Sequence, residues 1–314
     1  MSSQIDGFYS IDLHIHSSYS EDGEFTPSEL IKACIDAGIS TMAIADHNCV
    51  EGAREAFKIK DSIEKSKNSR LGCYPAIEID CTYQNINFHV LGYNFNLEST
   101  DFDMIEQNIR SQCAYASKER LRLVNELGFH LTVADLGSIT AGGYWSENWT
   151  GEVFAETLLK HPSYLRSDIL LPYRDGGKRS DNPYVNFYWD YCSQGKPCFV
   201  NMIYPDMKEV LDIIHRNKGV AVLAHPGVNL KGNFDMIDSI ISLGFDGVEA
   251  YSSYHDRETA LWLLRKANQR GIFVTSGSDF HGKTKPAIKL GYSGAGAFIQ
   301  ADPDLTLLTR SSFK

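Results

Sequence analysis

The sequence predicts an α/β protein whose strands and helices alternate and whose strands close into a barrel. Short apolar runs alternate with amphipathic stretches over roughly the first 95 residues, and the same rhythm returns in the last 110. Such alternation with short connections is typical of parallel strands joined by crossover helices. The two flanks supply about seven strands, which is enough to close a barrel. A chain of 314 residues fits one barrel with an insertion better than two unrelated domains.

The first flank contains four expected strands and two expected helices. The strands are expected at residues 8–16, 40–47, 71–80 and 86–95, and the helices at 26–38 and 51–67. Thr26 is the expected N-cap of the first helix, with Pro27 in its first turn and Gly38 as its terminator. The turn-prone pair Gln84–Asn85 separates the last two strands.

The second flank repeats this pattern, whereas the middle differs. Helices are expected at 206–219, 234–244 and 257–271, and strands at 220–227, 246–252 and 272–282. The middle begins with a long helix over 101–128 and continues with a polar, aromatic stretch. We therefore expect residues 1–97 and 200–300 to form one discontinuous barrel domain, 98–199 a mostly helical insertion over the active-site end, and 301–314 a C-terminal tail.

Charge and cysteine usage limit the expected partners. The net charge is −10 with neutral histidines, and an acidic chain is poorly suited to wrapping long nucleic acid. We expect no long nucleic acid as a partner, but a small phosphorylated substrate fits, because bound cations can reverse the local field. The seven cysteines form no CxxC pair, which favours reduced buried thiols. No signal pattern or membrane-length apolar run is seen, so we expect a cytoplasmic protein without a membrane partner and infer no protein partner.

Histidines and carboxylates recur where the expected strands end. They form an HxH pair, a DH pair, a single glutamate, an HP pair and a DxH pair. In order they are His14 and His16, Asp46 and His47, Glu78, His225, and Asp279 and His281. Residues two apart in a strand point to the same side, and the carboxyl ends of barrel strands share one face. His89, near the start of its expected strand, fits this rule less well.

Each of these residues also has a structural interpretation. A lone histidine in an apolar run is often a hydrogen-bonded core residue. Asp46 could cap the helix that follows it, and Glu78 could pair with a surface lysine. The recurrence of such groups at successive strand ends favours a metal site instead.

Imidazole and carboxylate ligands without thiolate suit zinc, manganese or iron. About nine candidate ligands imply two or three ions, with a carboxylate such as Glu78 able to bridge two of them. Such a cluster serves hydrolysis at phosphorus or at an activated carbonyl. The segment GYSGAG at 291–296 is not a dinucleotide fingerprint, no P-loop motif is present, and Ser17 and Ser18 lie outside a nucleophile elbow.

Six segments in order resemble the polymerase and histidinol phosphatase (PHP) family. They are IDLHIHSSYSEDGEFTP, IADHN, AIEID, FHVLGY, LAHPG and TSGSDFHG, and they span both flanks, about two-thirds of the chain. The resemblance implies a distorted seven-stranded (β/α) TIM-like barrel with a metal cluster at the carboxyl ends of its strands. It is closest to the short phosphoesterase branch, which acts on small phosphate esters.

The resemblance also implies a set of ligands for each ion. The first ion would be held by His14, His16, Glu78 and Asp279, the second by Glu78, His89 and His225, and the third by Asp22, His47 and His281. Asp22 stands where other family members carry histidine or aspartate. Asp46 would orient His47 from behind the ligands.

In the middle the resemblance decays. Many short-branch relatives have an Arg-Pro-His segment that helps to bind phosphate, and this chain has NWTGEVFAETLLKH there. Our substitute hypothesis is that Arg174, Lys178 and Arg179 reach over the site and hold the phosphate; the alternative is an exposed basic loop. His255 could protonate the leaving oxygen or contact the phosphate, or it could be structural.

The expected function is hydrolysis of a small phosphomonoester, histidinol phosphate or a nucleotide, by attack of a metal-bridged hydroxide on phosphorus. Asp279 would take part in catalysis as a ligand, and Glu78 would bridge. One alternative is a cyclic-phosphate or short-oligonucleotide phosphodiesterase or exonuclease. Another is a non-catalytic metal-binding module that regulates a partner.

Overall fold

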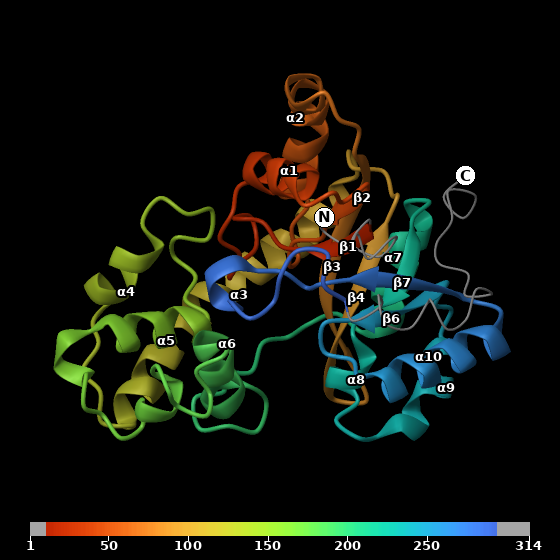
Figure 1. Cartoon of the computed structure of the whole chain (residues 1–314). Helices are drawn as coiled ribbons and strands as arrows, with labels where there is room; N and C mark the ends of the chain where they lie inside the picture. Colours follow the sequence, from red (N-terminus) through yellow and green to blue (C-terminus); the bar gives the residue numbers. More distant parts are fainter. Residues whose placement is uncertain (1–10, 294–314) are drawn as a thin grey trace.

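The computed structural model describes residues 11–293, and seven strands form one barrel-like sheet in sequence order (Figure 1). The strands are β1 (Ile11–Ile15), β2 (Thr41–Ile44), β3 (Gly72–Tyr83), β4 (Ile86–Tyr93), β5 (Val220–Leu223), β6 (Gly247–Ser252) and β7 (Phe273–Gly277). The predicted fold class, an α/β barrel with a helical insertion, is confirmed.

The sheet closes between its first and last strands. The backbone N–H of His16 donates to the carbonyl of Phe280 at 2.9 Å, and that of Asp279 donates to the carbonyl of His14 at 2.8 Å. The apolar cluster that fills the barrel draws its buried members only from strands and their ends: Leu13, Ala43, Ala45, Ala76, Leu91, Tyr93, Val222 and Ala224. Small alanines alternate there with larger side chains, as a narrow barrel requires.

Strand β4 corrects the expectation of parallel strands throughout, because it runs antiparallel to both β3 and β5. The physical reason is its connection. Gln84 and Asn85 form a two-residue turn with φ of 50° and 63°, and so short a link can only reverse the chain. The reversal pairs His89 with Asp80, so the first half of β4 lies at the carboxyl end of its neighbours. This explains why His89 fitted the strand-end rule poorly.

Helices cover the outside of the barrel. They are α1 (Pro27–Asp36), α2 (Glu51–Lys67), α7 (Met207–Arg216), α8 (Pro226–Asn229), α9 (Ile237–Ile241) and α10 (Arg257–Arg270), with short 3₁₀ turns at Phe234–Met236 and Gly282–Thr284. Helix α1 begins as predicted: Thr26 Oγ1 accepts from the backbone N–H of Glu29, whose carboxylate accepts from the N–H of Thr26. Its buried face packs with Met42 and Ile44 of β2.

Between β4 and α7 the described chain is helical and contains no strand. Its elements are α3 (Thr100–Glu126), α4 (Val133–Thr140), α5 (Gly151–Lys160), α6 (Pro183–Phe187), 3₁₀ turns at Pro162–Tyr164 and Leu171–Tyr173, and a π-turn at Tyr188–Cys192. These helices lie beside the barrel (Figure 1) around an apolar cluster of their own that includes Val124, Phe154 and Phe187. The division at residues 97 and 199 stays a prediction, and the expected tail, 301–314, lies outside the described residues.

Two contacts join the insertion to the barrel near the strand ends. The indole N–H of Trp145 donates to the carbonyl of Tyr19 at 2.5 Å. The ammonium of Lys283, which follows β7, pairs with Glu156 of α5 at 2.9 Å. The insertion is therefore anchored to the loops that follow β1 and β7.

Candidate active site

All nine predicted metal ligands lie together at one end of the barrel. They are His14, His16, Asp22, His47, Glu78, His89, His225, Asp279 and His281, called here the candidate metal cluster. Each sits in a strand or in the loop after one, so side chains far apart in sequence converge. His225 and Asp279 have φ of 22° and 58°, a region that side-chain-bearing residues seldom adopt. Such backbone strain concentrates at functional sites.

The first predicted set forms a compact group. The Nε2 atom of His14 lies 3.1 Å from Glu78 Oε2 and 3.3 Å from Asp279 Oδ1. The Nε2 atom of His16 lies 3.2 Å and 3.0 Å from the same two oxygens. Ligands about 2.0–2.2 Å from a shared ion lie near this distance from one another. The four atoms therefore have the spacing of ligands around one ion.

The second predicted set is arranged around the other oxygen of Glu78. Its Oε1 lies 2.9 Å from His89 Nδ1 and 3.0 Å from His225 Nε2. His47 Nδ1 lies 3.3 Å from Oε2, so this histidine also approaches the carboxylate. Glu78 faces two groups of imidazoles with its two oxygens, which is the position of a bridging ligand.

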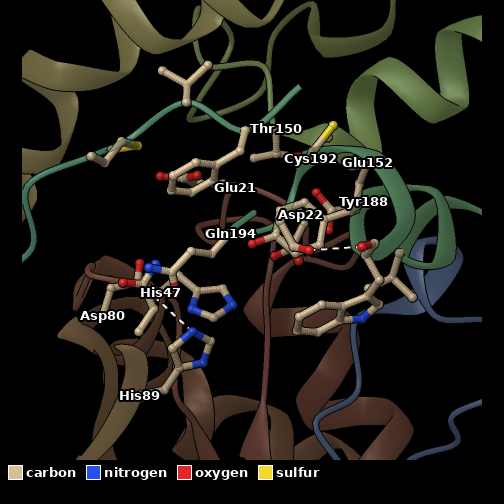
Figure 2. A pocket seen from close by; sticks show the side chains of 18 of the residues that line it. Glu21, Asp22, His47, Asp80, His89, Thr150, Glu152, Tyr188, Cys192 and Gln194 are labelled. Atoms are coloured by element: carbon tan, nitrogen blue, oxygen red, sulfur yellow. Dashed lines mark hydrogen bonds and ion pairs between the residues drawn. The ribbon is translucent and has the colours of Figure 1, made fainter. Parts of the chain in front are cut away.

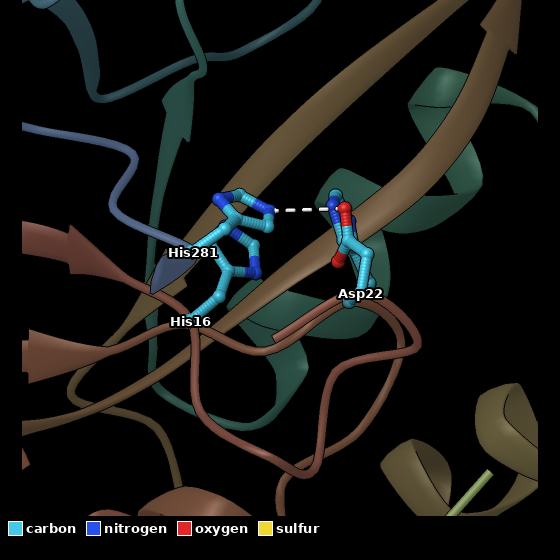
Figure 3. A group of neighbouring side chains, drawn as sticks. His16, Asp22 and His281 are labelled. Atoms are coloured by element: carbon cyan, nitrogen blue, oxygen red, sulfur yellow. Dashed lines mark ion pairs between the residues drawn. The ribbon is translucent and has the colours of Figure 1, made fainter. Parts of the chain in front are cut away.

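The third predicted set gathers around Asp22 (Figure 3). His281 Nε2 lies 3.3 Å from Asp22 Oδ2, and the ring of His281 stacks on that of His16 with centroids 3.8 Å apart. His47 offers a further ligand atom to this group. His16 and His47 thus lie between sets, and the three groups form one continuous cluster.

The donor atoms of the cluster fit divalent cations. Seven buried side-chain atoms in it have no hydrogen-bond partner among the described residues: His14 Nε2, His16 Nε2, Asp22 Oδ1, His47 Nδ1, Glu78 Oε2, Asp279 Oδ1 and His281 Nε2. A buried polar atom without a partner is costly, and native proteins rarely leave several together. Nitrogen and carboxylate atoms converging in this way match the ligands of zinc, manganese or iron.

Contacts behind the ligands fix the orientation of the imidazoles. His14 Nδ1 is 3.0 Å from Glu249 Oε1, His16 Nδ1 is 2.8 Å from Ser20 Oγ, and His225 Nδ1 is 2.8 Å from Asn229 Oδ1. Such partners set the tautomer and direct the opposite nitrogen at the ion. Glu249 was not among the expected site residues, although a glutamate in the middle of the apolar run DGVEAYS was a signal for it.

Three further polar residues touch the cluster and were not predicted. Asp279 Oδ2 accepts from the hydroxyl of Tyr254 at 2.5 Å and from the ammonium of Lys285 at 2.6 Å. Asp80 Oδ1 lies 3.0 Å from His89 Nε2. Asp80 could have been found, because it lies two residues after Glu78 and alternate strand residues share a face. Lys285 comes after the DxH pair but belongs to no motif, so no sequence signal marked it.

At His89 and Glu78 the combined attraction of neighbouring charged groups outweighs the effect of burial on the pKa. Burial alone would lower the pKa of His89, but Glu78 and Asp80 raise it to about 10. Burial would raise the pKa of Glu78, yet His14, His89 and His47 hold it well below its ordinary range. Because metals bind neutral imidazole, an ion entering the site must displace protons.

Asp46 and His255 each hold a loop that carries candidate ligands. Asp46 accepts from the backbone N–H of Ser17 at 2.6 Å and from its hydroxyl at 2.7 Å. It therefore holds the loop after the HxH pair. His255 Nε2 accepts from the N–H of Gly227 at 3.0 Å, which leaves Nδ1 to donate to the carbonyl of Ala250 at 3.0 Å. Both ring nitrogens are engaged by backbone, so His255 supports the loop that carries His225.

The structure does not bring the expected basic loop to the cluster. Arg174 donates to the carbonyls of Leu159 and Tyr164 within the insertion, each at 3.0 Å. Arg179 pairs with Asp190 at 3.1 Å. Neither these two arginines nor Lys178 lines the cavity over the cluster. The arginines stabilise the insertion, and we do not carry this phosphate-binding hypothesis further.

A cavity of about 180 Å³ opens between the cluster and the insertion (Figure 2). His47, Asp80 and His89 line its barrel side. Glu152, Tyr188 and Cys192 face them from the helical insertion. A substrate in this cavity would contact the candidate metal cluster on one side and the insertion on the other.

Comparisons with known proteins agree with this fold and site. Residues 12–143 match the family model of the PHP domain. The 5′-3′ exoribonuclease of Haemophilus influenzae is 26% identical over 86% of this chain and 89% of its own length. The 3′,5′-nucleoside bisphosphate phosphatase of Chromobacterium violaceum is 24% identical over 86% of this chain and 87% of its own length.

Solved structures share the fold over most of the chain. A Bifidobacterium adolescentis protein assigned as a metal-dependent phosphoesterase superposes with a TM-score of 0.71 at 24% identity, covering 90% of this chain and 91% of its own. An amidohydrolase from C. violaceum superposes with a TM-score of 0.70 at 20% identity, and the match covers 93% of this chain and 96% of the amidohydrolase chain. The fold and site define a barrel hydrolase of the metal-dependent class. Within that class, residues 12–143 of the chain are similar to the PHP domain.

The relatives correct one expectation. Proteins similar over most of this chain, from H. influenzae and from Escherichia coli, are named 5′-3′ exoribonucleases. The expectation that long nucleic acid is excluded is therefore wrong. Net charge averages over the whole surface, whereas an enzyme that works at a strand end needs only a few local phosphate contacts.

In residues 11–293 no helix is long and apolar enough to cross a membrane.

Proposed function

We propose that the protein is a metal-dependent phosphoesterase that hydrolyses a phosphate ester of a ribonucleotide. The observation that carries this proposal is the convergence, at one end of the barrel, of seven buried ligand atoms that have no hydrogen-bond partner among the described residues. Such a cluster suits phosphoryl chemistry, in which charge develops on oxygens around phosphorus. The named relatives act on RNA, nucleoside bisphosphates and a phosphoribosyl cyclic phosphate, and all three are esters of ribose.

The cluster would hold two or three ions. His14, His16, Glu78 and Asp279 would bind the first. Glu78 with His47, His89 and His225 would bind the second, and His16, Asp22, His47 and His281 the third. Bound divalent ions would supply an activated water and neutralise charge on the phosphoryl oxygens. Zinc, manganese and iron all fit these ligands.

The residues of the chain have separate tasks in this proposal. Glu78 would hold two ions, because its two oxygens face different histidines of the cluster, His14 and His89. Glu249 and Ser20 keep the imidazoles of His14 and His16 directed at the ions. The insertion covers the cluster and excludes bulk water, which strengthens the electrostatic interactions inside the cavity. A phosphomonoester and a short RNA end both fit this arrangement.

The proposal is tested by phosphate or nucleotide release from a panel of nucleoside monophosphates, nucleoside bisphosphates, cyclic phosphates and short RNA. Each is assayed with and without added Mn²⁺. A His14→Ala/His16→Ala variant should lose metal-dependent release, because it loses two ligands of the first set. His130→Ala, an exposed histidine of the insertion, is the matched control and should retain it. Absence of release from every ester by folded, metal-loaded protein would refute the proposal.

A further inference from the structure

The wall of the cavity that faces the candidate metal cluster is polar and deeply buried. Arg120 comes from α3, Asn148 and Thr150 from the segment before α5, and Glu152 from its first turn. These four residues are called the roof; Figure 2 shows Thr150 and Glu152 across the cavity from His47 and His89. Arg120 and Glu152 are each 8% exposed and Asn148 is 5% exposed.

Several roof atoms have no hydrogen-bond partner among the described residues. Arg120 donates from Nη1 to the carbonyl of Trp149 at 2.6 Å, but its Nε has no partner. Asn148 Oδ1 accepts from Ser117 Oγ at 3.3 Å, while its Nδ2 has no partner. Thr150 Oγ1 has none either. The amide of Asn148 lies near the carboxyl group of Glu21, and the hydroxyl of Thr150 lies near that of Glu152. Arg120 Nε is left to meet a ligand with hydrogen-bond acceptors, because a buried donor without a partner is costly.

The charges around the cavity are divided between its two sides. The roof carries one guanidinium, on Arg120, and one carboxylate, on Glu152, and Glu21 adds a second carboxylate to the same cavity. The lysines of the cavity, Lys231 and Lys285, belong to the barrel flank, and Lys285 lies 2.6 Å from Asp279 of the cluster. The lysines therefore lie beside the cluster, and the single guanidinium of the roof shares its side of the cavity with two carboxyl groups.

Aromatic side chains complete the cavity. Tyr188, Trp189 and Phe199 line it from the insertion, and the rings of Tyr188 and Trp189 lie with centroids 5.2 Å apart. Aromatic rings beside a polar recess offer a stacking surface for a nucleobase, worth about 1–3 kcal/mol per base. Carboxylates accept from hydroxyl and amino groups, while Arg120 and Asn148 donate.

We propose that the roof is a binding subsite for the uncharged nucleoside part of the substrate, its base edge and ribose hydroxyls, and not for a second phosphate. The inference rests on the proposed function and names the substrate class more closely. The phosphate to be cleaved lies at the cluster, beside Lys285, and the nucleoside lies between the roof and the aromatic rings. The enzyme therefore favours a nucleotide with one phosphate at the cluster and gains nothing from a second.

Three substrates test this selectivity: an adenosine monophosphate, adenosine 3′,5′-bisphosphate and phenyl phosphate. We expect kcat/KM for the monophosphate to exceed that for phenyl phosphate by about tenfold or more, the value of one stacked base. We expect the bisphosphate to differ from the monophosphate by less than about threefold, under 0.7 kcal/mol. A bisphosphate preferred by tenfold, or phenyl phosphate hydrolysed as well as the nucleotide, would overturn the assignment of the roof.

A matched pair of variants locates the effect. Glu152→Gln removes a roof carboxylate with little change in shape, and Glu147→Gln makes the same change at an exposed site in the same segment. We expect the ratio of kcat/KM for the nucleotide to kcat/KM for phenyl phosphate to fall about tenfold in Glu152→Gln, because a buried polar group discriminates strongly between substrates that pair with it and substrates that do not. The same ratio should stay constant in Glu147→Gln. Equal ratios in both variants would count against the roof.

A binding measurement separates failure of the subsite from failure of the proposed function. Adenosine carries no phosphate, so its binding to metal-free protein needs no catalysis. We expect adenosine to change tryptophan fluorescence saturably, the change to be lost in Trp189→Phe, and inorganic phosphate to cause none. If no ester is hydrolysed but adenosine binds, the subsite holds and the phosphoesterase proposal fails. If esters are hydrolysed but adenosine does not bind, the subsite is refuted.

Discussion

At the scale of the residue, Glu249 joins two ligands that come from different strands. Its Oε1 lies 3.0 Å from His14 Nδ1, and its Oε2 accepts from the backbone N–H of His225 at 2.9 Å. The side chain is fully buried in β6. One carboxylate thus sets the ring orientation of one ligand and the backbone position of another.

Replacing Glu249 by glutamine should weaken metal binding. A glutamine has one oxygen, so either His14 or the N–H of His225 would face an NH₂ group. Loss of such a partner costs about 10–100-fold in metal affinity. Isothermal titration of metal-free protein with Zn²⁺ measures the change, with Glu258→Gln, exposed in the first turn of α10, as the control. A folded Glu249→Gln variant with unchanged affinity would show that His14 and His225 are positioned by other contacts.

The metal ligands were open to prediction from sequence because motifs such as HxH and DxH place two donors on one side of the chain. The supporting residues were not. His255 looks like a catalytic candidate in sequence, and only the structure shows both its nitrogens bound to backbone. Arg179 looks free in sequence, yet it pairs with Asp190. Whether a polar side chain is already satisfied depends on distant residues, which local patterns do not encode.

At the scale of the element, the β3–β4 hairpin places two site residues. Its turn, Gln84–Asn85, has positive φ at both positions, a conformation that Asn-Gly adopts most readily. The reversal sets His89 opposite Asp80. The turn-prone pair Gln84–Asn85 was a signal for this reversal, but the alternation of strands and helices along the chain led us to expect parallel strands throughout. Strand number and order were predictable from apolar periodicity, whereas strand direction depended on one connection.

The double substitution Gln84→Asn/Asn85→Gly should stabilise this hairpin. Left-handed backbone costs most residues about 1–2 kcal/mol, and asparagine and glycine adopt it more easily. We expect the free energy of unfolding to rise by about 1 kcal/mol, measured as the urea midpoint at constant slope. Gln269→Asn, at an exposed position of α10, controls for composition and should give no gain. A lower midpoint in the double variant would mean that the present turn residues make stabilising contacts of their own.

At the scale of the whole molecule, an acidic chain carries a site for anionic substrates. The net charge of −10 supported the mistaken exclusion of long nucleic acid. The field at the cluster is set instead by bound ions, which can be the largest local charges of a site. Without ions the carboxylates of the cluster outweigh burial and raise the pKa of His14 and His89, so metal content and protonation are linked.

Metal removal should therefore make stability depend on pH. In metal-free protein Glu78 and Asp80 outweigh burial and raise the pKa of His89 to about 10, above about 6.5 for an unfolded histidine. The stabilising contribution of this charge is complete below pH 6.5 and is lost as the pH rises through about 10. We expect the melting temperature of chelated protein to fall by roughly 2–8 °C between pH 7 and pH 10.

Metal-loaded protein should lack this dependence, because bound ions keep His89 neutral throughout the range. In chelated protein, His89→Gln should abolish the fall of the melting temperature with rising pH. That result would assign the pH dependence to His89. Titration with Zn²⁺ at pH 8, in two buffers of different ionisation enthalpy, should show protons released on binding. Equal slopes in chelated and loaded protein, with no proton release, would mean that His89 is already neutral without metal and that its carboxylate neighbours do not charge it.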